Sequence, residues 1–516
     1  YFTDLDNIKK LKLTDVNQTL TQFLVPQHRI SGDIQPTPEE QKKALKQKQA
    51  AEPAKTLTQT DLQAEPLKDS RVYQQEVADY VKASKQSLVN TEKKIQRGTL
   101  KNGIQYALYP TSTRDDKTYA TISIDFGTEK SLFNQGEVLD LMAYLLLRGS
   151  DQYSLQDIAD KSIEAGGGAT ANAAGNSITI QIVAKKEKFA DYFKFMLEVL
   201  KKPKFEPSQF DLIKSQSLSA LDRPYTEPET VAALTMTRLL ETYQPGDLRY
   251  HFEPEFSKQQ IKAATVEQVK TLYQNFFVSN HAQIAITGDY QAKTMLKILQ
   301  KEFGGWKAKL PYQRLNSDYQ AYPAQKVHTL SEQREFGNYQ SILTFPVGAD
   351  HPDTPALMVF SYILGDSQLS SRLAQELREK NALVYGFSSG LNLDEWLDSG
   401  ALTIEANYTA GKSAQVSQGV YKVLNDLLSK GVTEQELEAA KANILKKRVT
   451  ALEDERNIHR MLTPQLEHHR DLLFREKRDQ ALAKLTKADV DAVIKKYIKL
   501  DQFVEVMADQ YGKAQK

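Results

Sequence analysis

Hydrophobic residues recur along this chain with two periods, one typical of strands and one typical of helices. Alternation of apolar and polar residues predicts strands at 122–126, 178–182 and 402–408. Apolar residues at steps of three and four predict amphipathic helices at 189–200 and 416–427. The two periods alternate from about residue 98 to residue 509, so the predicted fold class is α+β, with helices layered on mainly antiparallel sheets.

Glycines and capping residues mark where several helices begin and end. The helix at 416–427 should stop at Gly431, and Thr433 with Glu436 has the spacing of a capping box for the next helix. The run Gly166–Gly168 is interpreted as a helix stop and a turn into the strand at 177–184. A phosphate-binding loop is not indicated, because no Lys-Ser/Thr follows the glycines.

One pattern occurs three times in the chain. Residues 265–290 and 486–511 each contain a threonine cap, an amphipathic helix, a short polar turn and a strand that ends at Asp289 or Asp509. A third copy runs from Val16 to Gly32-Asp33. Repetition of one internal order indicates that one domain type is used repeatedly.

The repeats divide the chain into five expected regions. Residues 36–70 are rich in Gln, Lys, Ala and Glu with spaced prolines, which predicts an extended linker, and a helix is expected at 71–95. The regions are the tail of a preceding domain at 1–35, the linker and helix at 36–95, a first whole domain at 96–305, a connector at 306–324 and a second whole domain at 325–516.

Composition removes several classes of function. The formal net charge is +1 over 516 residues, which offers no electrostatic footprint for nucleic acid. No stretch approaches 18 apolar residues, so no transmembrane segment is expected. The absence of cysteine excludes thiol nucleophiles, disulfides and cysteine-ligated metals, and no G-x-S-x-G nucleophile elbow is present.

Three motifs carry a resemblance to a known family. They are Leu100–Ile104, the stretch Phe126–Glu129 followed by Gly136, and the run Ser370–Tyr385, which reads SSRLAQELREKNALVY. The chain is similar in these motifs to the pitrilysin/insulinase family of zinc metallopeptidases, which includes the mitochondrial processing peptidases. The resemblance implies α/β domains paired into two halves that close around a chamber, with this chain as the half that does not carry zinc.

The family's catalytic motif, H-x-x-E-H on a helix, is absent. Its two histidines bind zinc and its glutamate activates the metal-bound water. The resemblance aligns Asp140, Ala143 and Tyr144 with the three motif positions, and Ala220 with the more distant glutamate ligand. Since these four residues are no ligand set, no metal or other cofactor is expected in this chain, and zinc is expected in a missing N-terminal half.

Histidines elsewhere offer no alternative zinc site. The densest group is His459 with Glu467, His468 and His469, but His468 follows His459 by nine positions, which is not the spacing of ligands on a helix. These residues are predicted to lie on a solvated, charged helix. His281 is predicted to be structural, at the junction of a turn and a strand.

The remaining chemistry is substrate binding. In the resembled family an arginine and a tyrosine seven residues apart reach the peptide at the zinc site, and Arg378 and Tyr385 match them. Arginine presents a fixed fork of donors to a peptide carbonyl. A tyrosine hydroxyl can donate to a carbonyl oxygen as it gains charge.

Two functions are compatible with these features. In the first, the chain is the C-terminal, substrate-binding half of a zinc endopeptidase whose zinc half precedes Tyr1 in the same polypeptide. In the second, it is a non-catalytic subunit that pairs with a separate zinc-bearing chain, or a protein of peptide binding or assembly. The resemblance and the lack of cysteine favour a bacterial periplasmic or envelope location.

Overall fold

The structure, a computed structural model, describes residues 12–23, 67–332, 335–367 and 370–513. The chain divides into two units, residues 1–63 and 64–516. In the first unit, helix α2 (Leu13–Phe23) coincides with the helix expected in the third copy of the repeat. The strand end expected at Gly32-Asp33 and most of the expected linker lie outside the described residues.

The first sheet of the second unit has six strands in the order β1-β2-β6-β3-β5-β4. The strands β2 and β6 are parallel, and all other neighbours are antiparallel. The strands are β1 (Gln96–Thr99), β2 (Gln105–Pro110), β3 (Lys117–Asp125), β4 (Gly168–Ala174), β5 (Ser177–Lys185) and β6 (Ala282–Gly288).

The second sheet has five strands in the order β7-β11-β8-β10-β9. Here β7 and β11 are parallel, and the other neighbours are antiparallel. The strands are β7 (Gln325–Leu330), β8 (Phe336–Phe345), β9 (Val384–Leu393), β10 (Gly400–Thr409) and β11 (Val504–Asp509).

The two sheets have the same topology. Strands β2, β3, β4, β5 and β6 occupy the places of β7, β8, β9, β10 and β11, with the same chain order and the same single parallel pair. Strand β1 is an addition at the edge of the first sheet. The predicted repetition of one mixed α/β fold is therefore confirmed, while the domain limits at 96–305 and 325–516 stay a prediction.

Helices cover one face of the first sheet. The alternate residues Ile122, Ile124, Ile178, Ile180 and Ile182 are all buried on this face. The helices of this half are α5 (Glu129–Leu132), α6 (Gly136–Leu145), α7 (Leu155–Ala165), α8 (Phe189–Lys201), α9 (Pro207–Leu221), α10 (Pro228–Leu240), α11 (Pro254–Ala263), α12 (Val266–Phe276) and α13 (Ala292–Phe303).

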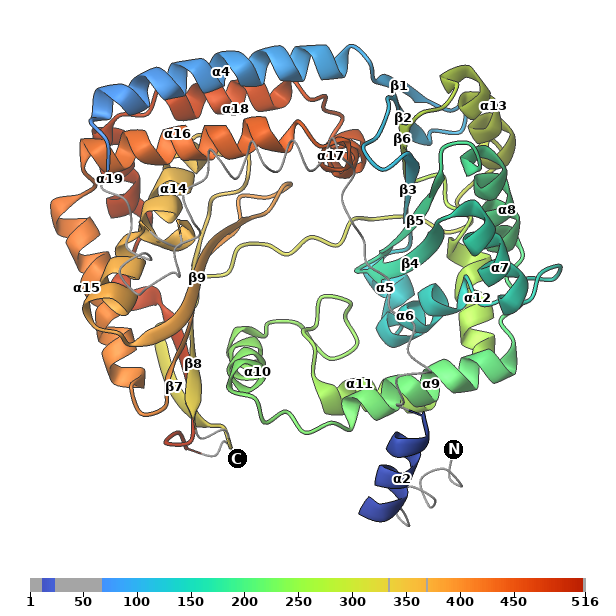
Figure 1. The fold of residues 1–516 in the computed structure, drawn as a ribbon, viewed down its shortest axis with the longest axis horizontal. Coiled ribbons are helices and arrows are strands. Elements are labelled where there is room, and N and C mark those ends of the chain that lie inside the picture. Colours follow the sequence, from blue (N-terminus) through green and yellow to red (C-terminus); the bar gives the residue numbers. More distant parts are fainter. Residues whose placement is uncertain (1–11, 24–66, 333–334, 368–369, 514–516) are drawn as a thin grey trace. The chain divides into compact units, whose positions relative to one another are not determined.

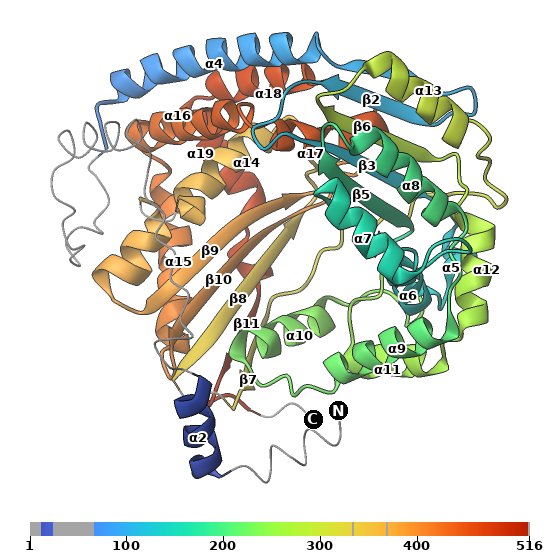
Figure 2. The same ribbon diagram turned by 45° about the vertical axis from the view of Figure 1, so that its right-hand side comes forward.

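A second helical layer covers one face of the second sheet, against the buried residues Leu402, Ile404, Ala406 and Tyr408. Its helices include α4 (Ser70–Glu92), which lies along α16 (Glu434–Ala451) and α18 (Phe474–Ala483) (Figures 1 and 2). The others are α14 (Thr354–Ser361), the π-helices η3 (Tyr362–Asp366) and η4 (Ala374–Lys380), α15 (Ser413–Lys430), α19 (Lys487–Tyr497) and the short 3₁₀-helix η5 (Leu500–Gln502). Helix α17 (Glu455–Glu467) follows α16 in the chain but packs on the first sheet.

The opposite face of each sheet is covered by a helix from the other half of the chain. Helix α17, which follows the second layer, packs on β2, β3 and β6 through Ile458, Leu462 and Leu466. Helix α10, which precedes the second sheet, packs on β8 and β11 through Ala232 and Met236. This reciprocal exchange joins the two sheets into one compact unit.

Local sequence signals account for many of these boundaries. Thr265, Thr433 and Thr486 each form a capping box, and Gly431 ends α15 with a φ of +70°. The interpretation of Gly166–Gly168 was only partly right. Gly166 ends α7 in the left-handed conformation, but Gly168 begins β4, whose small residues gave no apolar alternation.

The motif Leu100–Ile104 forms the turn between β1 and β2. Leu100 and Ile104 are joined by a backbone hydrogen bond of 2.8 Å, and Gly103 has a φ of +99°. Glycine adopts this conformation without steric cost, which explains the Asn-Gly pair at this turn.

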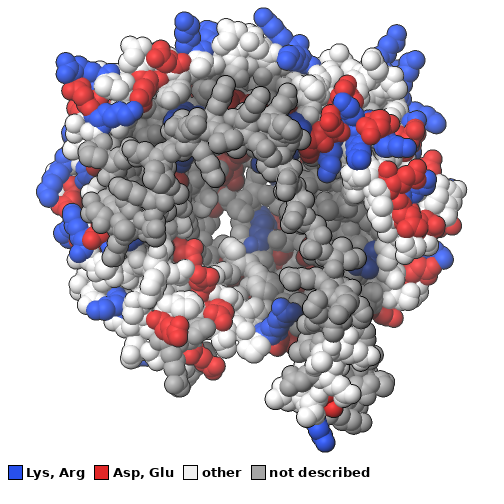
Figure 3. Space-filling model, in the orientation of Figure 1, with Lys and Arg blue, Asp and Glu red and all other residues white. Residues whose placement is uncertain are grey.

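The surface carries both signs of charge. On the face drawn in Figure 3, Lys and Arg are interspersed with Asp and Glu, in agreement with a net charge of +1. No helix in the described part of the chain is long and apolar enough to cross a bilayer.

Candidate functional site

Arg378 and Tyr385 lie on either side of a tight connection between η4 and the edge strand β9. The wide turns of η4 end when Ala382 donates its backbone N–H to the carbonyl of Arg378 at 3.1 Å. Ala382 has a φ of +46°, and Leu383 then donates to the carbonyl of Leu377 at 2.8 Å. The chain therefore reverses directly from the helix end into the start of the strand.

A β-bulge at this start turns Tyr385 outward. Gly386 is paired with Asn407 and Val384 with Tyr408, so Tyr385 is the extra residue of β9. Uninterrupted alternation would place Tyr385 on the buried side with Phe387. The bulge gives that side to Val384 and leaves Tyr385 74% exposed.

The hydroxyl of Tyr385 makes one long hydrogen bond within the described part of the chain. Thr409 Oγ1 donates to it over a long 3.5 Å, and Thr409 lies beside the bulge at the end of β10. A solvent-facing phenol held from a strand end can therefore donate its proton to an incoming acceptor.

Arg378 differs from the other charged side chains of its segment. Arg372 binds both carboxylate oxygens of Glu436 at 2.8 Å and the carbonyl of Gly431 at 2.9 Å, so it fastens η4 to the start of α16. Glu376 accepts from Lys422, which lowers the pKa of its carboxyl. By contrast, Nη2 of the half-buried Arg378 is buried without a hydrogen-bond partner among the described residues.

A buried guanidinium nitrogen with no acceptor is costly unless something supplies one. A peptide carbonyl has the matching chemistry, because it offers lone pairs to a donor of fixed direction. The seven-residue spacing thus places a cationic donor without a described partner and an exposed hydroxyl donor on the two sides of one connection, between η4 and β9.

Helix α6 carries three of the positions aligned with the zinc motif. Asp140 and the 56% exposed Tyr144 lie four residues apart on one face, whereas Ala143 is buried in the core. Ala220 is exposed near the end of α9, which packs against α6. Among the described residues no three His, Asp or Glu side chains are grouped so as to hold a metal ion.

A hollow of about 280 Å³ lies beside α6 and contains Glu137, Asp140 and His251. Asp140 lines this hollow. Desolvation of its carboxyl by the surrounding protein, and secondarily the nearby Glu137 carboxylate, raises its pKa to about 6. His251 is engaged by Glu241, with 3.0 Å between its Nδ1 and the carboxylate. One carboxylate, an alanine, a tyrosine and a second alanine do not fit a zinc ion.

The prediction for the histidine group was wrong for His459. This residue is only 7% exposed, because α17 docks on the first sheet instead of lying in solvent. Its ring nitrogens bind Thr121 Oγ1 at 2.9 Å and Thr287 Oγ1 at 3.0 Å, and burial lowers its pKa to about 4. His468 stacks on Trp396 with ring centroids 4.1 Å apart.

Comparisons with known proteins agree with the motifs. Residues 263–444 match the model of the peptidase M16 inactive domain. An uncharacterized zinc protease of Mycobacterium leprae is 27% identical over 203 residues, which are 38% of this chain and 43% of that protein. The chain therefore spans less than half the length of this curated relative.

Two solved structures share the fold. The peptidase M16 inactive domain from Pseudomonas fluorescens has a TM-score of 0.70 at 20% identity, over 82% of this chain and 99% of its own. The periplasmic protease PqqL from Escherichia coli has a TM-score of 0.65 at 15% identity, over 97% of this chain and 55% of its own.

Proposed function

This chain belongs to the pitrilysin/insulinase (M16) family of zinc metallopeptidases through the inactive domain at residues 263–444, and from that premise we propose that it is a substrate-binding half without a catalytic centre. Zinc and its ligands come from another half, in the same polypeptide or in a separate subunit. The two halves together hydrolyse peptides. The structural likeness to a periplasmic protease supports a place in the bacterial envelope.

One observation carries this proposal: Arg378, whose Nη2 has no hydrogen-bond partner among the described residues, and the outward-facing Tyr385 flank the same short connection between η4 and β9. Arg378 holds the carbonyl next to the scissile bond, using donors that no described residue occupies. Tyr385 donates its hydroxyl proton to the oxygen of the scissile carbonyl as negative charge develops on it. These two residues bind and orient the peptide, while activation of water belongs to the zinc-bearing half.

The test is the substitution Tyr385→Phe in the enzyme assembled with its zinc-bearing half. Loss of the hydroxyl should lower kcat about 100-fold with little change in KM, as for removal of an oxyanion donor. Steady-state kinetics on a fluorogenic peptide measures both constants. Because the ring is 74% exposed, the melting temperature should not change.

Tyr511→Phe is the matched control, since Tyr511 is 63% exposed and follows β11, with its ring beside Gly411 and not on β9. It should leave both constants unchanged. A Tyr385→Phe enzyme with wild-type kcat would show that the hydroxyl has no catalytic part, and the proposal for the pair would fail.

The non-ligating residues on α6 also support a second candidate, a peptide-binding or assembly protein that never acts with a zinc half. Under either candidate the isolated chain should hold no stoichiometric zinc and cleave no peptide. Metal analysis after chelation and reloading with zinc checks this expectation. About one tightly bound zinc per chain, together with cleavage, would contradict both candidates.

A further inference from the structure

A second cleft lies between α14, β9, α16 and α18. Two adjoining hollows, of about 540 and 320 Å³, form it by sharing five lining residues. These shared residues are Ala349, Thr354, Met358, Arg448 and Arg478. Neither Arg378 nor Tyr385 lines either hollow, so this α14–α18 cleft is distinct from the site described above.

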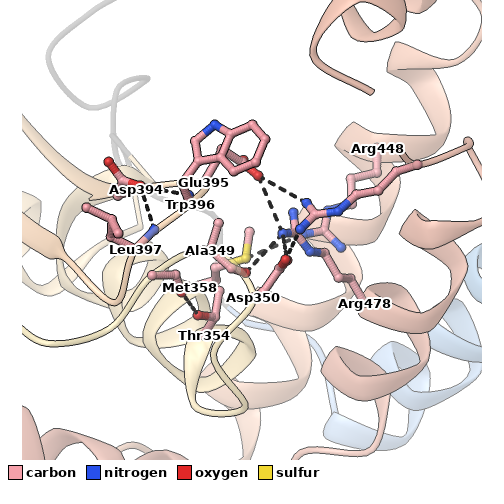
Figure 4. A network of polar contacts seen from close by, with 12 residues as sticks. Ala349, Asp350, Thr354, Met358, Asp394, Glu395, Trp396, Leu397, Arg448 and Arg478 are labelled. Atoms are coloured by element: carbon pink, nitrogen blue, oxygen red, sulfur yellow. Dashed lines mark hydrogen bonds and ion pairs between the residues drawn. The ribbon is translucent and has the colours of Figure 1, made fainter. Parts of the chain in front are cut away.

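Two arginines that face each other form the polar wall of the α14–α18 cleft (Figure 4). Arg478 uses Nη2 to bind the carbonyl of Ala349 at 3.0 Å and a carboxylate oxygen of Asp350 at 2.6 Å. Arg448 donates from Nη1 to the buried Asp479. These contacts hold both guanidinium groups in place at the junction of the two hollows.

Several donors around this junction have no anionic partner. Among the described residues, the hydrogen-bond acceptor of Arg448 Nη2 is the thioether of Met358, at 3.4 Å, which is a weak acceptor. Lys447 lines the larger hollow, and its ammonium lies 5.3 Å from the centre of the Tyr362 ring with no carboxylate paired to it in the described part of the chain. Arg475 precedes Asp479 by one turn of α18, and no described group accepts from its guanidinium.

The cations also disfavour one another. Burial, and then the neighbouring Arg448, lowers the pKa of Arg475. Burial lowers the pKa of Arg478 as well, although Glu395 opposes this. A group of half-buried cations with spare donors is therefore stabilised by an added anion.

The other residues that line the cleft are both acidic and apolar. Asp366 and Glu395 line the larger hollow and Asp350 lines the smaller one, and Asp350 and Glu395 pair with Arg470 and Arg478. Apolar side chains form part of each wall. The larger hollow has Leu391, Leu393 and Ile444, and the smaller one has Pro352, Pro355 and Leu482. A free inorganic anion would leave these walls in contact with water. A carboxylate attached to an apolar chain would use both the walls and the cations.

We propose that the α14–α18 cleft is a second peptide-binding site, which takes a carboxylate, from an acidic side chain or from the C-terminus, together with the apolar residue beside it. The choice of a peptide as the carrier rests on the proposed function. The carboxylate meets Lys447 and the free donors of Arg448, and the apolar side chain packs on Leu391 and Leu393.

Three labelled hexapeptides test this proposal on the purified chain by fluorescence anisotropy. One ends in Leu-Glu with an amidated C-terminus, one in Leu-Gln amide, and one in Leu-Gln with a free carboxylate. At least one carboxylate peptide should bind about 10-fold more tightly than the neutral amide, and the tighter of the two identifies the source. Equal binding of all three would overturn the proposal.

Lys447→Gln should weaken binding of the preferred carboxylate peptide about 5- to 10-fold and leave the neutral amide unaffected. Lys446→Gln is the matched control, because Lys446 is the exposed neighbour on α16 that does not line the cleft. Equal effects of the two substitutions would overturn the proposal. So would displacement of the peptide by inorganic phosphate at equal concentration.

This test is independent of peptidase activity. Binding of the carboxylate peptide that is lost in Lys447→Gln but kept in Tyr385→Phe supports the cleft even if Tyr385→Phe retains wild-type kcat. In that case the proposed function fails and the second site stands.

Discussion

Arg372 and Arg378 lie on one short segment, yet they differ in their hydrogen-bond partners. Arg372 donates to Glu436 and to the carbonyl of Gly431, whereas Arg378 has a buried nitrogen that no described residue accepts from. Both belong to the motif that indicated the family, so the motif combines an arginine held in an ion pair with the arginine that we propose binds the peptide. Residue type could not separate these roles, because the difference lies in partners that are distant in sequence.

His459 makes stability depend on pH. Its pKa is lowered from 6.5 to about 4 in the folded protein, so the unfolded chain binds the additional proton between these values. The free energy of unfolding should therefore fall as pH decreases from 6.5 toward 4, by on the order of 3 kcal/mol from this group. Above pH 6.5 His459 is neutral in both the folded and the unfolded chain, so the stability that is lost at low pH is fully present.

Urea unfolding at pH 7 and pH 4.5 checks this expectation. His459→Gln keeps a donor and an acceptor for Thr121 and Thr287 but does not titrate. Between pH 7 and pH 4.5 the free energy of unfolding should fall by roughly 2 kcal/mol more in the wild type than in this variant. The exposed His469→Gln should behave as wild type, and equal losses in wild type and His459→Gln would refute the assignment.

Gly431 joins two helices and tolerates no side chain. It has a φ of +70°, and a Cβ placed there would lie 2.3 Å from a carboxylate oxygen of Asp491. That same carboxylate accepts from the backbone of Val432 at 2.9 Å, so it cannot withdraw freely. Gly431→Ala should therefore lower the free energy of unfolding by about 1–2 kcal/mol or more.

Chemical denaturation of Gly431→Ala and Gly305→Ala measures this difference. A Cβ at Gly305 meets nothing within 4 Å, and its backbone is not left-handed. Gly305→Ala should change the free energy of unfolding by less than about 0.5 kcal/mol. Equal effects of the two substitutions would mean that the helix junction can relax.

The boundaries that local chemistry sets were predictable from the sequence. Capping boxes, Gly431 and the apolar stripes act within a few residues, and the structure has them where they were expected. The bulge at Tyr385 was not predictable, because a bulge is defined by the register with a partner strand. Strand β4 was missed for a similar reason, since its pairing with β5 replaces the apolar alternation it lacks.

The sequence also did not predict that α10 packs on the second sheet and α17 on the first. An amphipathic stripe shows that a helix is covered but not by which partner. His459 is buried because α17 packs on the distant first sheet, and the prediction that His459 lies in solvent was wrong because the sequence does not identify this partner. For the candidate site, the seven-residue spacing could be read directly, whereas the unpartnered nitrogen of Arg378 required coordinates.

The reciprocal exchange should make the two sheets unfold together. Leu462 on α17 is fully buried against the first sheet, and Leu462→Ala should cost about 2–4 kcal/mol. Trp306 and Trp396 are the two tryptophans of the chain. Trp306 packs in the first half, and Trp396 lies in the turn between β9 and β10, where it stacks on His468 at the end of α17. Each can report alone after the other is replaced by Phe.

In the Leu462→Ala background both reporters should show the same lowered midpoint. A shifted transition for Trp306 with an unchanged one for Trp396 would show that the halves unfold independently. The exposed Leu212→Ala, on α9, is the control that should leave both midpoints in place.

Helix α4 is synthesised long before the helices that cover it, α16 and α18. It packs on α16 and α18, and Ser84 donates a buried hydrogen bond of 2.5 Å to Asp479, which is 395 residues later in the chain. At roughly 5–20 residues per second, a ribosome needs about 20–80 s to cover that interval. The apolar face of α4, with Tyr73, Val77 and Leu88, is therefore without its complete cover for that time, although these side chains are buried in the finished fold.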